Sequence, residues 1–429
     1  MPTESFFSQA SLALIASGGA EKDGKVYSIK PTDGTGDFTF SRGSNLAATR
    51  VGADGLIEKG RENLLTYSND FSQWTSTNTT ATSGQSGYDG TNDAWLLSKS
   101  AASGNLQKNL ALNSVQTYSL YAKANLSNWL ILEIRSGGFV YYDILNGVLG
   151  NFSNTSIIIN ASIEAVGNGW YRCSIIANAN SVGVRVYPAE ANGDASGTSG
   201  SIYIQDAQVE LGLAATEVIV SGATTGKAGL LEDTPRFDYS GGATCPSLLL
   251  EPSRVNLLPQ TEYYDGWPQT GTTLTTNTNE TLSPEGLYNA SKLVGNGTSG
   301  VIKSGIAKTG SVAASVYLKS ASGSVNVTFK DPYGGLSNQV KSVTTEWQRF
   351  DFIGDNGASF TGFWVDDIPA SGIYMWAAQI EQGSYATSYI PNHSGGTITR
   401  AGDLCFGAGD ASTFNDSEGV FYAEISTNT

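Results

Sequence analysis

The stretch Asn63-Leu-Leu-Thr-Tyr-Ser-Asn-Asp-Phe-Ser-Gln-Trp74 has a counterpart much later in the chain, Asn256-Leu-Leu-Pro-Gln-Thr-Glu-Tyr-Tyr-Asp-Gly-Trp267. Both stretches begin with Asn-Leu-Leu and end in tryptophan at the same spacing, and a glutamate, Glu58 or Glu251, stands five residues before each. Chance rarely preserves two spacings together. The agreement therefore indicates an internal duplication, which a chain of 429 residues is long enough to contain.

The repeat continues in the same order through both copies. The offset between matching segments shrinks from 193 to 171 residues along the chain. The second copy is therefore shorter, chiefly opposite the Gly/Ser-rich stretch 189–200. The later matches pair Tyr121-Ala-Lys123 with Tyr317-Leu-Lys319, Trp170-Tyr-Arg172 with Trp347-Gln-Arg349, and Ile202-Tyr-Ile-Gln-Asp-Ala-Gln-Val-Glu210 with Ile373-Tyr-Met-Trp-Ala-Ala-Gln-Ile-Glu381.

Each copy contains short runs in which apolar and polar residues alternate, such as Thr117-Tyr-Ser-Leu-Tyr-Ala-Lys123 and Ser324-Val-Asn-Val-Thr-Phe329. Alternation of this kind is typical of a strand with one buried face, and turns of the Asp-Gly and Gly-Gly type separate the runs. No segment has the sustained period and the caps of a helix. We predict an all-β fold of two tandem jelly-roll sandwiches.

The repeat divides the chain into five parts. We predict an N-terminal docking segment at 1–57, a first jelly-roll domain at 58–222, a linker at 223–250, a second jelly-roll domain at 251–391 and a C-terminal segment at 392–429. The C-terminal segment includes a strand-like run that begins at Gly419. A lone strand has no core, so we expect this run to pair with a neighbour or to belong to a further domain.

The composition excludes several classes of partner. A formal charge of −15 and a sequence pI near 4.5 leave no basic surface for the phosphates of nucleic acid or for an anionic membrane. No stretch approaches the roughly 20 apolar residues that a membrane-spanning helix needs. We therefore expect neither nucleic-acid binding nor membrane insertion.

Catalysis has little support in the sequence. His393 is the only histidine and stands in a linker-like stretch, so a Ser-His-Asp triad or a His-based metal site cannot be assembled elsewhere. A polysaccharide-degrading enzyme would need two facing carboxylates, for which Asp331, Asp366 and Asp367 are candidates. Adjacent aspartates point to opposite sides of a strand or lie together in a turn, so we predict a turn here and no enzyme.

Aromatic residues that differ between the two copies are the candidates for sugar binding. The tryptophan pairs Trp74/Trp267 and Trp170/Trp347 occupy equivalent places in both copies, so we predict that they belong to the cores. A ring that is present in one copy only is free to stack on the face of a pyranose, while nearby amides and carboxylates bind the hydroxyls. These candidates are Tyr141, Tyr142, Tyr187, Tyr333, Trp364 and Trp95.

A Gln-x-Glu motif recurs in the closing strand of each copy, at Gln208 and at Gln379. It places two polar side chains on one face of the strand. One interpretation is a structural Ca²⁺ site, because a hard cation takes several oxygen ligands. The alternative, which we favour, is a buried hydrogen-bonded pair that stabilises the strand. The Ca²⁺ candidates, the only cofactor ligands that we predict, are Asp89, Glu210, Glu285 and Glu381.

Four phrases of the chain carry a resemblance to a known group of proteins. They are Thr39-Phe-Ser-Arg-Gly-Ser44, Thr49-Arg-Val-Gly-Ala-Asp-Gly-Leu-Ile-Glu58, Leu248-Leu-Leu-Glu-Pro-Ser-Arg-Val-Asn-Leu-Leu258 and Ala378-Gln-Ile-Glu-Gln-Gly-Ser-Tyr-Ala-Thr-Ser-Tyr-Ile-Pro391. With these phrases nearly the whole chain resembles head-spike and tail-fibre proteins of bacteriophages. The repeated domains of those proteins are similar to carbohydrate-binding modules.

The resemblance implies a structural protein on the capsid or tail surface of a virion. Such a protein would dock onto other virion proteins through its N-terminal segment and would bind host or environmental glycans weakly. Several copies in a homo-oligomer would make weak binding useful. The resemblance also implies that Gly419 begins a lectin-like domain. Two alternatives stay open, a purely structural decoration or joining protein and a polysaccharide-degrading enzyme.

Overall fold

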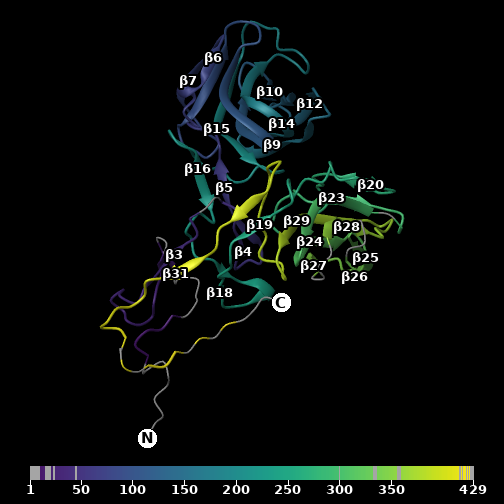
Figure 1. Ribbon diagram of the computed structural model, residues 1–429. Coiled ribbons are helices and arrows are strands. Elements are labelled where there is room, and N and C mark those ends of the chain that lie inside the picture. Colours follow the sequence, from purple (N-terminus) through teal and green to yellow (C-terminus); the bar gives the residue numbers. More distant parts are fainter. Residues whose placement is uncertain are drawn as a thin grey trace.

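The computed structural model describes residues 10–14, 21–22, 25–43, 46–298, 300–331, 336–354 and 359–414, together with 417, 419–421, 423 and 425. These residues form 31 strands and the two 3-10 turns Phe71–Gln73 and Ser240–Gly242. The predicted all-β fold with tandem sandwiches is confirmed. Figure 1 shows one sandwich at the top, the second at the right and the terminal segments below them. In the described part, no helix is long and apolar enough to cross a membrane.

The first unit is a sandwich built around two strands of 20 residues, β9 and β14, which pair along most of their length. One end of this pair carries β10, β11 and β12, and the other end carries β13, β15, β8 and β7. The core lies between the two layers and includes the fully buried Leu120, Leu132 and Val186. The strands are β6 Thr75–Thr77, β7 Thr79–Gln85, β8 Ala94–Lys99, β9 Asn105–Ala124, β10 Trp129–Ile134, β11 Gly138–Asp143, β12 Val148–Phe152, β13 Ile158–Gly167, β14 Trp170–Ala189 and β15 Ser201–Leu211.

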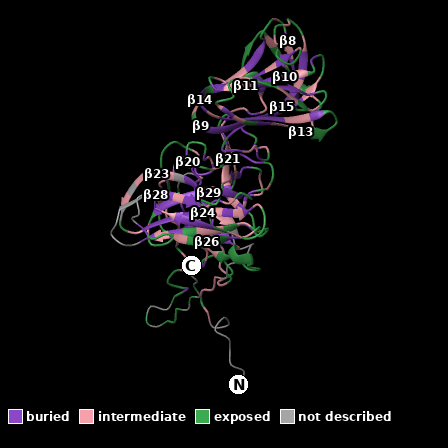
Figure 2. Cartoon of the chain, turned by 90° about the vertical axis from the view of Figure 1, so that its right-hand side faces the viewer, coloured by how far each residue is buried: buried purple, intermediate pink, exposed green. Residues whose placement is uncertain are grey.

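The second unit consists of two five-stranded sheets, in the orders β20-β23-β28-β25-β26 and β21-β22-β29-β24-β27. Its core contains Phe329 and Phe363, whose ring centroids lie 5.0 Å apart in an edge-to-face contact. Figure 2 shows the buried residues gathered inside both units. The strands are β20 Gln269–Thr270, β21 Thr273–Thr275, β22 Ser291–Val294, β23 Gly300–Thr309, β24 Val312–Ser320, β25 Val325–Lys330, β26 Gln339–Val343, β27 Gln348–Gly354, β28 Ser359–Asp366 and β29 Ile373–Gln382.

A buried asparagine closes each unit at the same place. In the first unit, Asn63 Nδ2 donates to the carbonyls of Ala207 (3.1 Å) and Ile219 (2.8 Å), and Asn63 Oδ1 accepts from the amides of Leu65 and Val209, both at 3.1 Å. One side chain thereby ties the entering strand, the closing strand and the segment that leaves the unit. Because all these groups are buried, each needs such a partner.

The second unit repeats this arrangement. Asn256 Nδ2 donates to the Ile390 carbonyl at 2.8 Å, and Asn256 Oδ1 accepts from the amides of Leu258 at 3.1 Å and Ile380 at 3.3 Å. The asparagine that begins both halves of the sequence repeat is therefore the residue that closes both sandwiches.

The predicted linker and both terminal segments contribute strands to a third body, which we call the junction. Its four-stranded sheet, β1-β2-β3-β31, joins residues near the two ends of the chain. Among the described residues after position 414, none belongs to a strand, and Tyr422 and Glu424 of the predicted run lie outside the described residues. The junction strands are β1 Glu21–Lys22, β2 Lys25–Val26, β3 Phe38–Ser41, β4 Thr49–Val51, β5 Ile57–Asn63, β16 Gly226–Gly229, β17 Phe237–Asp238, β18 Ser247–Leu248, β19 Arg254–Asn256, β30 Ile398–Arg400 and β31 Leu404–Phe406.

Buried ion pairs hold the junction together. Arg236 contacts Asp403 and lies 2.7 Å from Glu251, Arg400 lies 2.7 Å from Glu251, and Arg42 lies 3.4 Å from Asp403. Burial opposes ionisation of Glu251, but the two arginines outweigh burial and hold the pKa of its carboxyl below the usual value. Removing one partner of such a cluster would leave an uncompensated buried charge.

Strand β5 connects the two units. Its first residue, Ile57, packs against the second unit, and its last residue, Asn63, belongs to the first. Between them, Lys59 Nζ lies 3.0 Å from Glu262 and 3.1 Å from Glu285, two buried carboxylates of the second unit. These carboxylates outweigh the desolvation of the ammonium group and raise the pKa of Lys59. The pairing fixes the second unit against the strand that enters the first.

Replacing Asn63 with alanine removes four buried hydrogen bonds from the closure of the first unit. We expect Asn63→Ala to lower the free energy of unfolding by about 3 kcal/mol, because the freed amides and carbonyls stay desolvated. Denaturant unfolding measures the loss, and hydrogen exchange at the amides of Leu65 and Val209 localises it. The control is Asn113→Ala on the exposed edge of β9, where a change below about 0.5 kcal/mol is expected. Equal losses in the two variants would contradict this role.

Candidate carbohydrate-binding surface

An aromatic surface covers the outer side of β10, β11 and β14 in the first unit. Alternate residues of these strands point into the core, and those between them pack together on the opposite side. The strand register places Tyr141 and Tyr187 on either side of Ile131. The rings of Phe139 and Tyr141 meet edge to face, with centroids 5.7 Å apart. We call Trp129, Ile131, Phe139, Tyr141 and Tyr187 the aromatic face.

A row of polar side chains borders the aromatic face. Arg185 stands opposite Glu133 and Gln107 in the strand register. Its Nη1 lies 3.3 Å from Glu133 Oε2, its Nε donates to Gln107 Oε1 at 2.9 Å, and the Tyr187 hydroxyl donates to Glu133. Burial, together with the Glu133 carboxylate, raises the pKa of the Tyr187 hydroxyl, which therefore stays protonated. The row supplies donors and acceptors beside aromatic rings.

The loop 190–200, between β14 and β15, covers part of the aromatic face. Asn192 Oδ1 accepts from the amide of Asn151 at 2.7 Å, so the loop reaches strand β12 on the far side of the face. Ala195 of the loop packs against the aromatic residues. Beneath it, Tyr141 is only 7% exposed. The open part of the surface therefore lies toward Tyr187 and the polar row.

The structure separates the predicted sugar-binding residues of the first unit. Tyr141 and Tyr187 lie on the aromatic face. Tyr142 does not, because strand alternation turns it into the core, where it is fully buried and its hydroxyl donates to a backbone carbonyl at 2.6 Å. Trp95 packs at the margin of the core, with its ring centroid 6.0 Å from that of Phe71. Tyr142 is therefore corrected from a binding candidate to a core residue.

Of the two predicted candidates of the second unit, Trp364 lies among the described residues. Trp364 is half-buried, and the Lys330 ammonium group lies over its ring at 5.0 Å, near Asp366. Tyr333 lies outside the described residues. On the described outer side of β25 and β28, Trp364 thus has a cation beside it instead of a second ring.

Sequence reasoning missed most of the surface. In the segment Trp129-Leu-Ile-Leu-Glu-Ile134, both sides of the strand carry apolar residues, which hides the alternation. A count of aromatic residues within two positions of Tyr141 would have found Phe139. No sequence signal places Arg185 beside Glu133, because the strands that carry them are joined only through pairing. The missed residues are Trp129, Phe139, Glu133, Arg185 and Gln107.

The repeated tryptophans largely follow the prediction. Trp74 and Trp267 are core residues, and each meets a neighbouring ring, that of Phe71 at 5.2 Å or that of Tyr264 at 5.1 Å, edge to face. Trp170 is also buried. Trp347 is only half-buried, and its indole nitrogen donates to a backbone carbonyl at 2.7 Å, so for this residue the core prediction was wrong.

The Gln-x-Glu motifs form the buried pairs that we favoured over a Ca²⁺ site. Gln208 Nε2 donates to Glu210 Oε1 at 2.7 Å, and the Thr216 amide donates to the same oxygen at 2.7 Å. In the second unit, Gln379 donates to Glu381 at 2.9 Å, and the hydroxyl of Thr387 donates to the other carboxylate oxygen at 2.7 Å. Both glutamates are therefore occupied by hydrogen bonds within the protein.

The other two Ca²⁺ candidates have partners of their own. Asp89 Oδ1 accepts from the amide and hydroxyl of Thr91 at 3.1 and 2.6 Å, and Glu285 forms ion pairs with Lys59 and Arg61. Within the described ranges, no group of three His, Cys, Asp or Glu side chains is arranged to hold a metal ion. The four predicted ligands are not brought together.

The carboxylates considered for glycoside hydrolysis are held within the protein. Asp366 pairs with Lys330, whereas Asp367 has a left-handed backbone (φ 59°) and accepts from the Thr328 hydroxyl at 2.5 Å. Asp331 is buried. The predicted turn at these residues agrees with the φ value of Asp367. His393 lies between the units, 3.9 Å from Glu262, and its burial lowers the pKa of the imidazole.

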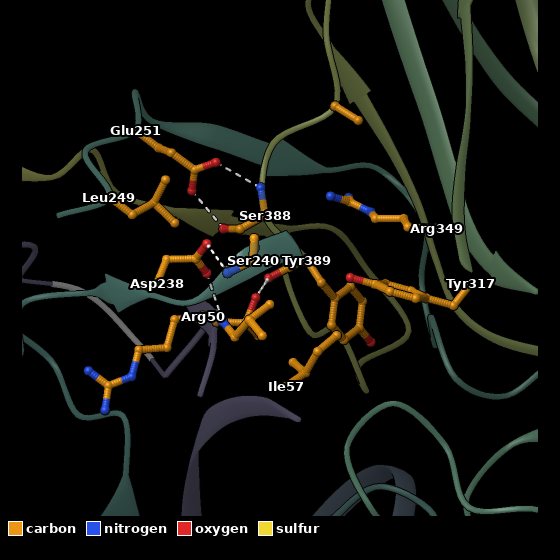
Figure 3. Close-up of a pocket in the computed structure, with 13 residues that line it drawn as sticks. Arg50, Ile57, Asp238, Ser240, Leu249, Glu251, Tyr317, Arg349, Ser388 and Tyr389 are labelled. Atoms are coloured by element: carbon orange, nitrogen blue, oxygen red, sulfur yellow. Dashed lines mark hydrogen bonds between the residues drawn. The ribbon is translucent and has the colours of Figure 1, made fainter. Parts of the chain in front are cut away.

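A small cavity lies between the junction and the second unit. Figure 3 shows Asp238 and Glu251 of the junction on one side and Tyr317 and Arg349 of the second unit on the other. Its volume is about 80 Å³, whereas small-molecule pockets usually have roughly 300 Å³ or more. Glu251 accepts from the amide of Ser388 at 2.8 Å, so the polar groups bind one another. The cavity lies at the interface of the junction and the second unit and is too small for a sugar chain.

Comparison with known protein families and with characterised proteins gave no match. Among solved structures, tandem CBM22 modules from Paenibacillus barcinonensis align with 75% of this chain and 98% of their own, at 11% identity and a TM-score of 0.24. Tandem CBM51 modules from Streptococcus pneumoniae align with 81% and 100%, at 8% identity and a TM-score of 0.22. An exo-β-1,3-galactanase from Phanerochaete chrysosporium aligns with 72% and 69%, at 10% identity and a TM-score of 0.22. At such low scores, we take nothing about function from these proteins.

A buried carboxyl group makes the stability of the first unit depend on pH. Burial raises the pKa of Asp206 to about 6, although the Tyr88 hydroxyl, which donates to it at 3.1 Å, opposes the rise. The folded state therefore binds this proton more tightly than the unfolded state, whose carboxyl has a pKa of about 3.9. The resulting stabilisation is complete below that value and is lost as the pH rises through about 6.

Asp206→Asn tests this dependence. The amide cannot ionise, so we expect the variant to gain stability relative to the natural chain at pH 7 and to gain less at pH 4. Denaturant unfolding of both proteins at both pH values measures the difference. Asp265→Asn is an exposed control. Its stability relative to the natural chain should be the same at pH 4 and pH 7. A stability difference between Asp206→Asn and the natural chain that is the same at pH 4 and pH 7 would contradict the raised pKa.

Proposed function

We propose that the chain is a non-catalytic glycan-binding protein and that the sugar lies on the open part of the aromatic face. The observation that carries the proposal is the gathering of four aromatic side chains on one outer side of the first unit, next to the polar row. Aromatic residues usually fill a core, whereas these lie on the side that faces away from it.

The chemistry of this surface suits a sugar. A pyranose presents C–H groups on one face and hydroxyls around its edge, so a ring such as that of Tyr187 can bind the face. The side chains of Glu133, Arg185 and Gln107 lie within one strand spacing and can bind the hydroxyls. A few fixed polar groups beside an apolar surface are typical of small-ligand sites.

The two units differ in what their outer sides carry. Trp364 of the second unit has the ion pair of Lys330 and Asp366 beside it, whereas in the first unit four aromatic side chains gather next to the ion pair of Arg185 and Glu133. We assign sugar binding to the first unit and a spacing role to the second. The ion pairs of Lys59 with Glu262 and Glu285 would then hold the spacer rigidly against the binding unit.

We further propose that the chain belongs to a bacteriophage virion, as a homo-oligomeric fibre or spike component docked through the N-terminal segment. The support for this part is the sequence resemblance alone. A half-buried ring such as that of Tyr187 gives weak binding, and many copies on one particle would raise the overall affinity without new contacts. Mass spectrometry of purified virions should detect the chain in several copies per particle. Its absence from infectious particles would contradict the virion role and leave glycan binding unaffected.

Tyr187→Ala tests the position of the sugar. We expect the full chain to bind one or more glycans on an array and the variant to bind them roughly tenfold more weakly, because one aromatic contact is lost. Titration calorimetry with the best array glycan measures the affinity. The matched control is Trp364→Ala in the second unit, which should leave the affinity unchanged.

Two outcomes would contradict the proposal. Equal binding by Tyr187→Ala and the natural chain would place the sugar elsewhere. Absence of binding, even when the folded chain is multimerised on beads, would favour the structural joining role, in which the sandwiches contact neighbouring proteins. Release of shorter sugars from any polysaccharide on the array would instead favour an enzyme.

A further inference from the structure

We infer that the first unit recognises the end of a neutral glycan chain and does not bind along the interior of a polysaccharide. The inference rests on the proposed function and adds a substrate class to it. It follows from the loop 190–200, which closes the aromatic face on one side, and from the charges around the opening.

The loop is anchored on both sides of the aromatic face. At its start, Glu190 lies 2.5 Å from the buried Lys99 ammonium group, which also donates to the Ala195 carbonyl at 3.3 Å. On the far side, Asn192 accepts from the Asn151 amide at 2.7 Å and donates to the Asn151 side chain at 3.2 Å. The loop thus spans from β14 to β12 and is fixed to both.

The crossing point lies beside Trp129 and Tyr141, which are diagonal neighbours on β10 and β11. A Cβ atom on Gly150 would lie 2.6 Å from the Trp129 ring and 2.6 Å from Asn192 Oδ1, so ring, loop and strand are in close contact there. A sugar chain cannot pass through this contact. The loop therefore closes the aromatic face at this end.

The other end of the aromatic face, at the polar row, stays accessible. The side chains of Arg185 and Glu133 are 29% and 19% exposed, in contrast to the covered Tyr141. A glycan that enters here meets Tyr187 first and then the wall formed by the loop. A glycan that runs along the strands toward Tyr141 therefore has to end at the loop, so a chain terminus or a short oligosaccharide fits there, whereas an internal segment would have to continue past the loop.

The duplication provides an internal comparison for the loop. Eleven residues, 190–200, join β14 to β15 in the first unit, whereas six residues, 367–372, join β28 to β29 at the equivalent place in the second. The unit with the aromatic face is also the unit with the long loop. The two features have diverged together, as expected if they serve one ligand.

The charges favour a neutral sugar. Arg185 is paired with Glu133, so the polar row carries no free cation to bind a carboxylate or sulfate. Burial raises the pKa of the Tyr141 hydroxyl, and the carboxylates of Asp194 and Glu190 on the loop add to the rise. Glu190 is paired with Lys99, so an anionic sugar would meet the carboxylate of Asp194 as well as the overall charge of −15.

Competition experiments with the full chain test the inference. The probes are neutral glucan, galactan, mannan and xylan oligosaccharides, the corresponding long polymers at equal sugar mass, and oligosaccharides that end in a uronic acid. We expect neutral oligosaccharides to compete at least tenfold better than the polymers, which have few ends per sugar. The uronic-acid forms should compete at least tenfold more weakly than the neutral ones.

Two variants separate the loop from the rest of the site. In the first, residues 190–200 are replaced by the six-residue sequence of 367–372, and in the second Asn192→Ala releases the far anchor while the fold is kept. Both should gain affinity for a polymer and keep affinity for the oligosaccharide. The control, Asp265→Asn at an exposed position of the second unit, should change neither.

The outcomes distinguish the inference from the proposed function. If the natural chain binds polymer and oligosaccharide equally per unit mass, or binds the uronic-acid form as well as the neutral one, end recognition of neutral glycans is wrong while glycan binding stands. If the natural chain binds none of the neutral probes in any form, both are wrong.

Discussion

Hydrogen bonds to one buried asparagine side chain, four in the first unit and three in the second, determine how each sandwich closes. Asn63 joins the strand that enters the first unit to the strand that completes it, and Asn256 does the same in the second. A buried amide that lost these partners would cost more than the bonds contribute, so the arrangement fixes one register for the whole unit. The Gln208 and Gln379 pairs reinforce it. The frame is therefore specified by a few polar contacts inside an apolar core.

A frame fixed from inside leaves the outer sides free to change. The two units keep the same closure and the same strand order around it, yet the first carries an aromatic face and a long loop and the second carries Trp364 beside a lysine. The residues that differ lie on the side of the strands that the core does not use. Duplication thus supplied two equal sandwiches, of which one has a surface suited to a ligand and the other a surface suited to spacing.

The sequence predicted those features of the fold that depend on the spacing of residues along the chain. The repeat, the all-β fold and the buried Trp74 and Trp267 follow from spacing and alternation alone. Alternation also dictates that Tyr141 and Tyr142 cannot both point outward, but it does not say which one does, because Phe139 and Val140 are both apolar. The junction could not be predicted, since Arg42, Arg236 and Asp403 come together from segments far apart in the chain. Burial of these charges depends on pairings that no local pattern records.

The meeting of β3 with β31 has a mechanical consequence. Thr39 stands opposite Phe406 and Ser41 opposite Leu404, so tension applied to the two terminal segments pulls this antiparallel pair apart from one end, one rung after another. The next contact in the line of force is the salt bridge between Arg42 and Asp403, which Arg236 shares. The ion cluster is then the clamp that bears the load, and the two sandwiches are strained only after it has yielded.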